Sequence, residues 1–248
     1  MSDAWRLIDD LATPVDAAGQ MAADVALLED VGRGAMPALR LYRWARPALS
    51  LGHFQSAVDV DHAACTRLGV EVVRRPTGGK ALLHGADLTY AVVFPRPSGL
   101  DGGVDSIHDL IAAALIAGLG HLGVDATLAR HDGPGGPVCF VGQQGADLRV
   151  GTRKLCGSAQ VRRAGAVLQH GSILLDRLDF DETDLFGHLA PAGRIPVTRA
   201  RLHEVTVTLT ELGVDDAPLV VAQALVDGFT QTLEVNFTSR LGTPSTIT

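Results

Sequence analysis

The sequence predicts a single domain built from both α-helices and β-strands. The chain has 248 residues, of which 46% are hydrophobic, and this is enough apolar material for one well-buried core. Apolar side chains recur at helical spacing in several segments, while runs of β-branched and aromatic residues flank turns that contain glycine. Because no linker or internal repeat divides the chain, we expect residues 1–235 to form the domain and residues 236–248 a frayed tail.

The first part of the chain predicts a helix followed by two strands. In "AAGQMAADVALLEDVG", Ala18, Met21, Val25 and Leu28 fall at helical spacing before Gly32. The next segments, "PALRLYRWA" and "ALSLGHFQ", are typical of short strands. We expect these two strands to pair with each other as a hairpin.

The middle of the chain predicts a strand–turn–strand unit and a long helix. "VDHAACTRLG" is typical of a short helix that ends at Gly69, after which residues 70–75 and 86–94 form strands around a Gly-Gly-Lys turn. Residues 105–119 carry apolar side chains at helical spacing. The glycines of "GLGHLG" (118–123) close this helix instead of following a strand, so this G-x-G-x-x-G does not predict a dinucleotide site.

The last part of the chain predicts a loop, a sheet and further helices. "RHDGPGGPVCFVGQQG" is too rich in Gly and Pro for a regular element. From Asp147 to Leu175, strand-like runs separated by two tight turns predict a three-stranded meander. Helical patterns return at residues 181–189 and 217–233.

Composition excludes several classes of function. A net charge of -7 and a pI near 5.6 argue against broad nucleic-acid binding, which needs a basic face. The N-terminus lacks a signal pattern and no apolar stretch is long enough to span a membrane, so we expect a cytoplasmic protein with no membrane partner. Three cysteines without C-x-x-C spacing predict neither a disulfide framework nor a metal site.

The segment "VEVVRRPTGGKALLHGADLTY" contains a Gly-Gly-Lys turn that invites a phosphate-binding interpretation. A phosphate-binding Walker loop needs a glycine five positions before its Gly-Lys pair and a Ser or Thr after it. Arg74 and Ala81 occupy those places, so the turn is not a standard nucleotide loop. A local basic site that includes Arg75 and Lys80 remains open.

Cys139 and Lys154 are the first candidates for chemistry. A free cysteine is most often a small buried hydrophobe, but Cys139 lies in the Gly/Pro loop, where core packing is a weaker explanation. Lys154 lies on the following meander, next to the small residues of "CGSAQ", and a thiolate needs such a cationic neighbour. A solvated hairpin lysine is the alternative.

His84 and His170 are candidate acid–base groups or hydrogen-bonded scaffolding, and Cys65 and Cys156 are expected to be packing thiols.

Four segments together resemble one superfamily. "MAADVALL", "LSLGHFQ", "VVRRPTGGKALLHGADLTY" and "RKLCGSAQVRRAGAVLQHGSILL" occur in the order typical of the lipoate–protein ligase, octanoyltransferase and biotin–protein ligase superfamily. The resemblance covers about residues 15–235 and is greatest to the cysteine-dependent octanoyltransferases. It implies an α/β fold with a mixed sheet, like the catalytic core of class II synthetases, in a single domain.

The resemblance also implies a site. Cys139 matches the nucleophile of the octanoyltransferases and Lys154 its partner lysine, which would act as base with a pKa lowered by burial. The resemblance implies that an eight-carbon acyl chain is bound by Arg75, Thr77, Gly78, Gly79, Lys80, His84, Gly157, Ser158, Ala159 and His170. Backbone amides near Gly78 and Gly79 are candidate oxyanion donors.

The implied activity is octanoyl transfer from octanoyl-acyl-carrier protein, through a Cys139 thioester, to a lysine of a lipoyl domain. The acceptors would be lipoyl domains of 2-oxoacid dehydrogenase complexes or the glycine cleavage H protein, and no cofactor is required. Two alternatives remain open, namely an ATP- and Mg-dependent lipoate–protein ligase and an amidotransferase that moves lipoyl groups between proteins. A binding module for lipoyl domains or free lipoate, without turnover, is the non-enzymatic alternative.

Overall fold

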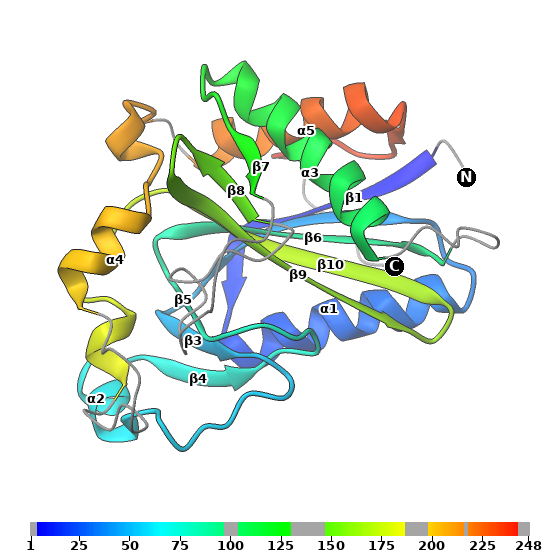
Figure 1. Ribbon diagram of the computed structural model, residues 1–248. Helices are drawn as coiled ribbons and strands as arrows, with labels where there is room; N and C mark the ends of the chain where they lie inside the picture. The colour runs from blue at the N-terminus through cyan, green and yellow to red at the C-terminus, as the bar shows by residue number, and fades with distance from the viewer. Residues whose placement is uncertain (1–3, 97–103, 130–146, 187–197, 216–217, 243–248) are drawn as a thin grey trace.

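The computed structural model describes residues 4–96, 104–129, 147–186, 198–215 and 218–242 (Figure 1). One sheet comprises β1 (Ala4–Val15), β2 (Ala38–Trp44), β6 (Asp87–Pro95), β7 (Thr127–Ala129), β8 (Asp147–Val150), β9 (Arg153–Arg163), β10 (Ala166–Leu174) and β11 (Asn236–Phe237). A small sheet comprises β3 (Ala48–Leu51), β4 (Glu71–Arg74) and β5 (Leu82–His84). The helices are α1 (Ala17–Gly32), α2 (His62–Arg67), α3 (Val104–His121), α4 (Arg199–Val205) and α5 (Pro218–Leu233), with short 3₁₀ helices η2 (Glu182–Leu185) and η3 (Thr210–Leu212).

The large sheet is mixed, in the order β11-β1-β2-β6-β10-β9-β8-β7. β1 runs parallel to its neighbours β2 and β11, and the other pairs in this sheet are antiparallel. The small sheet has the order β4-β3-β5, with β3 parallel to β4 and antiparallel to β5. A mixed-sheet α/β domain is therefore confirmed.

Helices α3 and α5 cover one face of the large sheet and seal an apolar core there (Figure 1). The two helices cross closely because glycines stand at their contact. A Cβ at Gly228 would lie 2.3 Å from the backbone nitrogen of Gly118, and a Cβ at Gly118 would lie 2.7 Å from the carbonyl oxygen of Ala224. The glycines of "GLGHLG" therefore include a helix-packing residue, in line with the rejection of a dinucleotide site.

The other face of the large sheet meets α1 and the small sheet (Figure 1). α1 begins at Asp16, whose side chain accepts a hydrogen bond from the backbone N–H of Gly19, and it buries Met21 and Leu28. Between the small sheet and η2 lies a separate apolar cluster. This second face is the one on which a pocket forms.

Several predicted elements are confirmed with small shifts at their ends, namely the helices α1, α2, α3 and α5 and the meander β8–β9–β10. The predicted hairpin of the strands now called β2 and β3 is wrong. β2 pairs with β1 and β6, whereas β3 pairs with β4 and β5 in the other sheet. Each strand has a partner elsewhere, so the chain crosses between sheets at residues 45–47.

Other expectations need correction. The two strands predicted around the Gly-Gly-Lys turn are confirmed as β4 and β6, but between the turn and β6 the chain also forms β5, which the sequence pattern did not predict. The helix expected at 181–189 is only the 3₁₀ turn η2, and the remainder of that range lies outside the described residues. Residues 236–242, expected as tail, bond to β1, where the N–H of Thr238 donates to the carbonyl of Trp5.

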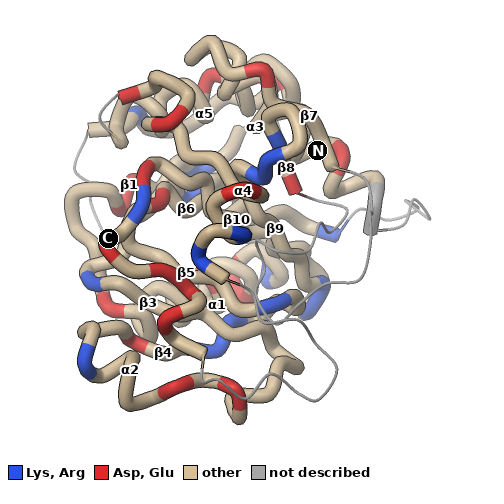
Figure 2. The backbone as a smooth tube through the Cα atoms, turned by 60° about the vertical axis from the view of Figure 1, so that its left-hand side comes forward, with Lys and Arg blue, Asp and Glu red and all other residues tan. Residues whose placement is uncertain are grey.

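Basic and acidic residues are interspersed along the chain (Figure 2). Within the described ranges, no helix is both long enough and apolar enough to cross a membrane.

Candidate active site

A pocket with an empty volume of about 430 Å³ opens between the large sheet, α1 and the small sheet. This volume includes space that is open to solvent. Seven residues expected to bind substrate line it: Arg75, Gly79, His84, Gly157, Ser158, Ala159 and His170. The pocket is also lined by residues that the sequence analysis did not select: Met21, Tyr42, Trp44, Ser50, Leu82, Thr89 and Gly171.

Arg75 holds the Gly-Gly-Lys turn in place. Its guanidinium donates to the carbonyl oxygens of Gly78 and Lys80 at 2.8 and 2.7 Å, and to the carbonyl of Ser50 at 2.9 Å. Gly79 has a φ of 92°, which favours glycine. The turn is thus closed by an arginine of the same chain, and it needs no phosphate to organise it.

The neighbouring Arg74 has a similar structural role. Its Nη1 donates to the carbonyl oxygens of Gly52, His53 and Gln55, within 2.7–3.0 Å. A Cβ at Gly52 would lie 2.0 Å from the carbonyl oxygen of Gly79, so the loop after β3 packs directly on the turn. The two adjacent arginines therefore fasten two loops together at the edge of the pocket.

His170 is fixed between a hydroxyl and a buried carboxylate. Its Nε2 lies 2.6 Å from Oγ1 of Thr77, and its Nδ1 lies 2.8 Å from Oδ2 of Asp24. Asp24 also accepts a hydrogen bond from Arg40 at 2.9 Å, which neutralises a carboxylate with no solvent exposure. Burial and the nearby Asp24 raise the pKa of Tyr42 well above its usual value, so this pocket-lining phenol stays neutral.

His84 has the same arrangement on the opposite wall. Its Nε2 lies 2.9 Å from Oγ of Ser50, and its Nδ1 lies 2.8 Å from Oδ2 of Asp87. Burial alone would raise the pKa of Asp87, but His84 and hydrogen bonds from Ser172 and the Gly85 N–H hold it below its usual value. Both nitrogens of each histidine have protein partners, which favours the scaffolding interpretation for His84 and His170.

Small residues on β9 and β10 leave room for the cavity. A Cβ at Gly171 would lie 2.6 Å from the carbonyl oxygen of Gly157 and 2.6 Å from the Tyr90 ring, so only glycine fits there. The Ser158 hydroxyl bonds the Tyr90 hydroxyl at 2.7 Å. The small residues expected to admit a substrate close to the sheet therefore do line the pocket.

Lys154 lies on the pocket side of β9 because of a β-bulge. The register with β8 shifts near Leu155 and Cys156, and both of these residues enter the core under α3 and α5. Since side chains alternate outside the bulge, Lys154 shares a face with Gly157. Without the bulge, strict alternation would have placed Lys154 and Gly157, which are three positions apart, on opposite faces of the sheet.

The Lys154 side chain is buried and ion-paired. Its Nζ donates to Oδ2 of Asp147 at 2.7 Å, and the two side chains are 2% and 1% exposed. The sequence analysis expected small apolar neighbours that would favour a neutral amine. A carboxylate stands within hydrogen-bond distance as well, and such a neighbour favours the charged ammonium. The role of Lys154 as base stays a prediction.

Cys139, the predicted nucleophile, lies outside the described residues. Cys65 and Cys156 are buried free thiols, as expected, and burial raises the pKa of Cys65. Thr77 is buried against His170, while Gly78 and Lys80 meet Arg75 through their carbonyls.

The site contains three buried carboxylates that sequence reasoning missed: Asp24, Asp87 and Asp147. Asp24 had a signal, because it lies three residues after Met21 and four before Leu28, on the apolar face of the predicted helix. Asp87 and Asp147 lie at the start of strands, where an aspartate ordinarily faces solvent. Across the described part of the chain, no group of three or more His, Cys, Asp or Glu residues could hold a metal.

Comparison with known proteins gives consistent results. The chain matches the family model of the lipoyl protein ligase A/B catalytic domain over residues 16–224. It is 38% identical to the octanoyltransferase LipM of Carboxydothermus hydrogenoformans, covering 95% of this chain and 88% of that protein. It is 40% identical to the LipM of Symbiobacterium thermophilum, covering 96% and 89%.

Solved structures agree with these matches. A lipoate-protein ligase A bound with ATP has a TM-score of 0.77 at 27% identity, covering 98% of this chain and 90% of that chain. A T. acidophilum protein with bound lipoic acid also has a TM-score of 0.77, at 28% identity and the same coverage. The chain belongs to the lipoyl protein ligase A/B catalytic domain family.

Proposed function

We propose that this protein is an octanoyltransferase, which moves an octanoyl group through a Cys139 thioester to a lysine of a lipoyl domain. The observation that carries the proposal is the identity of 38–40% with octanoyltransferases over most of both chains. The pocket supports it, because small residues and apolar walls at one end of β9 leave space for an acyl chain. The buried pair of Lys154 on β9 and Asp147 on β8 supplies a charge for the reaction.

The ion pair suggests how Lys154 takes part. As an ammonium, Lys154 stabilises the Cys139 thiolate, which attacks the donor thioester carbonyl. The C–S bond of the donor breaks, and its thiolate takes a proton from Lys154, so the donor leaves as a thiol. Lys154 is then a neutral amine beside the octanoyl thioester of Cys139.

In the second step the neutral Lys154 acts as base. The amine of the acceptor lysine attacks the Cys139 thioester and gives a proton to Lys154 as the amide forms. Cys139 leaves as a thiolate and Lys154 is again an ammonium, paired with Asp147. One thioester is used to form one amide, so the cycle needs no ATP and no metal. The donor in this proposal is octanoyl-acyl-carrier protein.

The test is the intact mass of the protein after mixing with octanoyl-acyl-carrier protein. We expect an octanoyl adduct that hydroxylamine removes and that a lipoyl domain discharges. Cys139→Ala should form no adduct, since it lacks the nucleophile. An adduct that persists in Cys139→Ala would contradict the role of this residue.

The ligase alternative makes a separate prediction. If the protein used lipoate, Mg and ATP, an adenylate bound to the folded state would raise its Tm by mass action. We expect no such shift, and no ATP-dependent modification of a lipoyl domain by Cys139→Ala. Modification by that variant with ATP would establish the ligase instead.

A further inference from the structure

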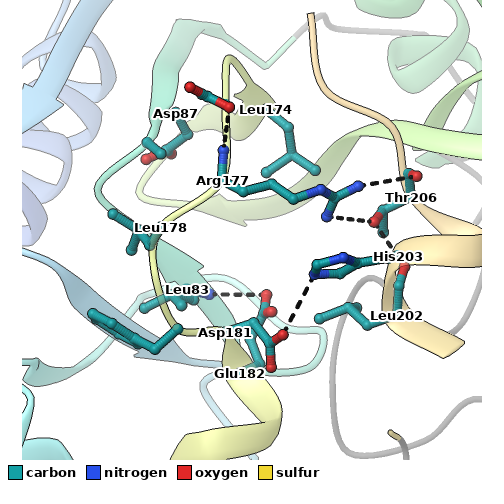
Figure 3. A pocket seen from close by; sticks show the side chains of 13 residues that line it. Leu83, Asp87, Leu174, Arg177, Leu178, Asp181, Glu182, Leu202, His203 and Thr206 are labelled. Atoms are coloured by element: carbon teal, nitrogen blue, oxygen red, sulfur yellow. Dashed lines mark hydrogen bonds and ion pairs between the residues drawn. The ribbon is translucent and has the colours of Figure 1, made fainter. Parts of the chain in front are cut away.

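A second cavity, with an empty volume of about 480 Å³, is lined by residues of β5, β10, η2 and α4 (Figure 3). It lies beside the first cavity on the same face of the large sheet. Strand β5 is the wall between the two cavities. Leu82 and His84 line the first cavity, whereas Leu83, between them in sequence, lines the second. Strand β10 runs beneath both, with His170 in the first cavity and Leu174 in the second.

The second cavity also adjoins the strand of Lys154. Thr206, which lines the cavity, forms a parallel bridge with Lys154, and the N–H of Val207 donates to the Lys154 carbonyl at 2.9 Å. In the other direction, the same strand continues to Gly157 and Ala159 in the first cavity. The Lys154 side chain lines neither cavity, but its backbone links the strand that borders the first cavity to Thr206 of the second.

A thioester donor has two arms on its reacting carbonyl group. If the carbonyl lies at Lys154 and the acyl chain fills the first cavity, the thiol arm must leave in another direction. The second cavity offers that direction along β10, since Leu174 at the end of this strand lines it.

The charged groups around the second cavity are largely paired with one another. Arg177 donates to Glu211 and to Thr206, and Asp181 accepts from Arg199 at 2.8 Å and lies 3.5 Å from His203 (Figure 3). The cations that the structure describes here are thus already matched by acceptors of the protein. A polyanionic ligand such as a triphosphate would have to displace these pairs.

Glu182 differs from these groups. It is 5% exposed, and its Oε1 accepts a long hydrogen bond of 3.4 Å from the Leu83 N–H. Burial raises its pKa to about 7, so near neutral pH much of it is a neutral carboxyl group. A neutral carboxyl both donates and accepts, which matches an amide. Leucines at 83, 174, 178 and 202 supply apolar walls.

We propose that the second cavity binds the pantetheine arm of the acyl donor, an uncharged chain with two amides. This assignment rests on the proposed function and adds the part of the donor that the first cavity does not hold. Glu182 would pair with an amide of the arm while the leucines contact its methylene and methyl groups.

The test compares two donors in single-turnover acylation of Cys139, followed by intact mass. Octanoyl-pantetheine carries the whole arm, and octanoyl-N-acetylcysteamine lacks its distal half. Leu174→Trp fills the cavity. It should lower the kcat/KM for octanoyl-pantetheine, divided by that for octanoyl-N-acetylcysteamine, about tenfold, since only the long donor loses contacts. Glu182→Leu should lower the ratio about fivefold, which provides a second variant if Leu174→Trp does not fold.

The control is Leu219→Trp, which adds the same side chain at a 48% exposed position of α5. Octanoyl-acyl-carrier protein and octanoyl-coenzyme A carry the same arm, and Leu174→Trp should lower the kcat/KM for acylation by both. The faster of the two with the parent protein identifies the source of the arm.

Two results would overturn the assignment. One is an unchanged donor ratio in folded Leu174→Trp and Glu182→Leu. The other is a defect confined to transfer from preformed octanoyl-enzyme to a lipoyl domain, which would make the cavity an acceptor site. Failure of the parent to be acylated by every donor would instead refute the proposed function, and this assignment with it.

Discussion

Strand β10 has two faces whose environments differ sharply. Toward α3 and α5 it presents Val167 and Ile173, which lie in a continuous apolar core. Toward the small sheet it presents His170 and Ser172, which bond to the buried carboxylates of Asp24 and Asp87. The same nine-residue strand thus seals one side of the sheet and builds a polar site on the other.

The two faces contribute differently to the stability of the fold. Apolar burial on the closed face stabilises the fold at about 25 cal/mol per Å². On the open face, by contrast, each buried charge must be paired, and buried pairs contribute little net stability. Two cavities open on this face, so it is organised for binding more than for stability.

The largest expected effect is that of Lys154→Ala on the open face. It should lower octanoyl transfer at least about a hundredfold, because a positioned acid–base group is lost. It should also lower the free energy of unfolding by about 3–5 kcal/mol, because Asp147 loses the lysine of a buried ion pair. Single-turnover kinetics and urea unfolding measure the two effects. Activity within a few-fold of the parent would refute the assigned role.

On the closed face, a substitution should affect stability without affecting catalysis. A methyl group at Gly228 would meet the backbone of α3 at 2.3–2.7 Å, so Gly228→Ala should cost about 1–3 kcal/mol. Gly120→Ala, on α3 with nothing within 4 Å, is the matched control and should be neutral or stabilising by up to about 1 kcal/mol. Equal effects of the two substitutions would contradict the close helix crossing.

A smaller effect concerns pH and the buried Glu182. Its pKa of about 7 in the folded protein exceeds the ordinary 4.5, so the folded state holds a proton that the unfolded state has lost. Parent stability should therefore fall as pH rises from about 4.5 to about 7. Glu182→Gln should remove this loss and be more stable than the parent at pH 8, by about 3 kcal/mol. Identical pH profiles from thermal unfolding would argue against a buried neutral carboxyl.

The sequence by itself determined the elements whose patterns are local. Apolar spacing located α1, α3 and α5, and glycine-containing turns located the β8–β9–β10 meander. Such patterns suffice because a helix face or a hairpin is specified by residues close together in the chain. The motifs around Arg75, His84 and His170 likewise marked residues that line one pocket.

Tertiary structure decided the partners. β2 and β3 have similar strand signals, but their pairing in different sheets depends on β1, β6, β4 and β5, which are distant in sequence. The hydrogen bonds of the two histidines to buried carboxylates could not be predicted from the sequence for the same reason, since Asp24 and His170 are 146 positions apart.

The charge state of Lys154 also depended on packing. Its position among small residues suggested a neutral amine, whereas a β-bulge turns its side chain to the pocket face, where it pairs with Asp147 of the next strand. A bulge depends on the register between two strands, and register follows from the packing of both against the core. Sequence therefore identified the lysine, and only the folded sheet determined which charge stands beside it.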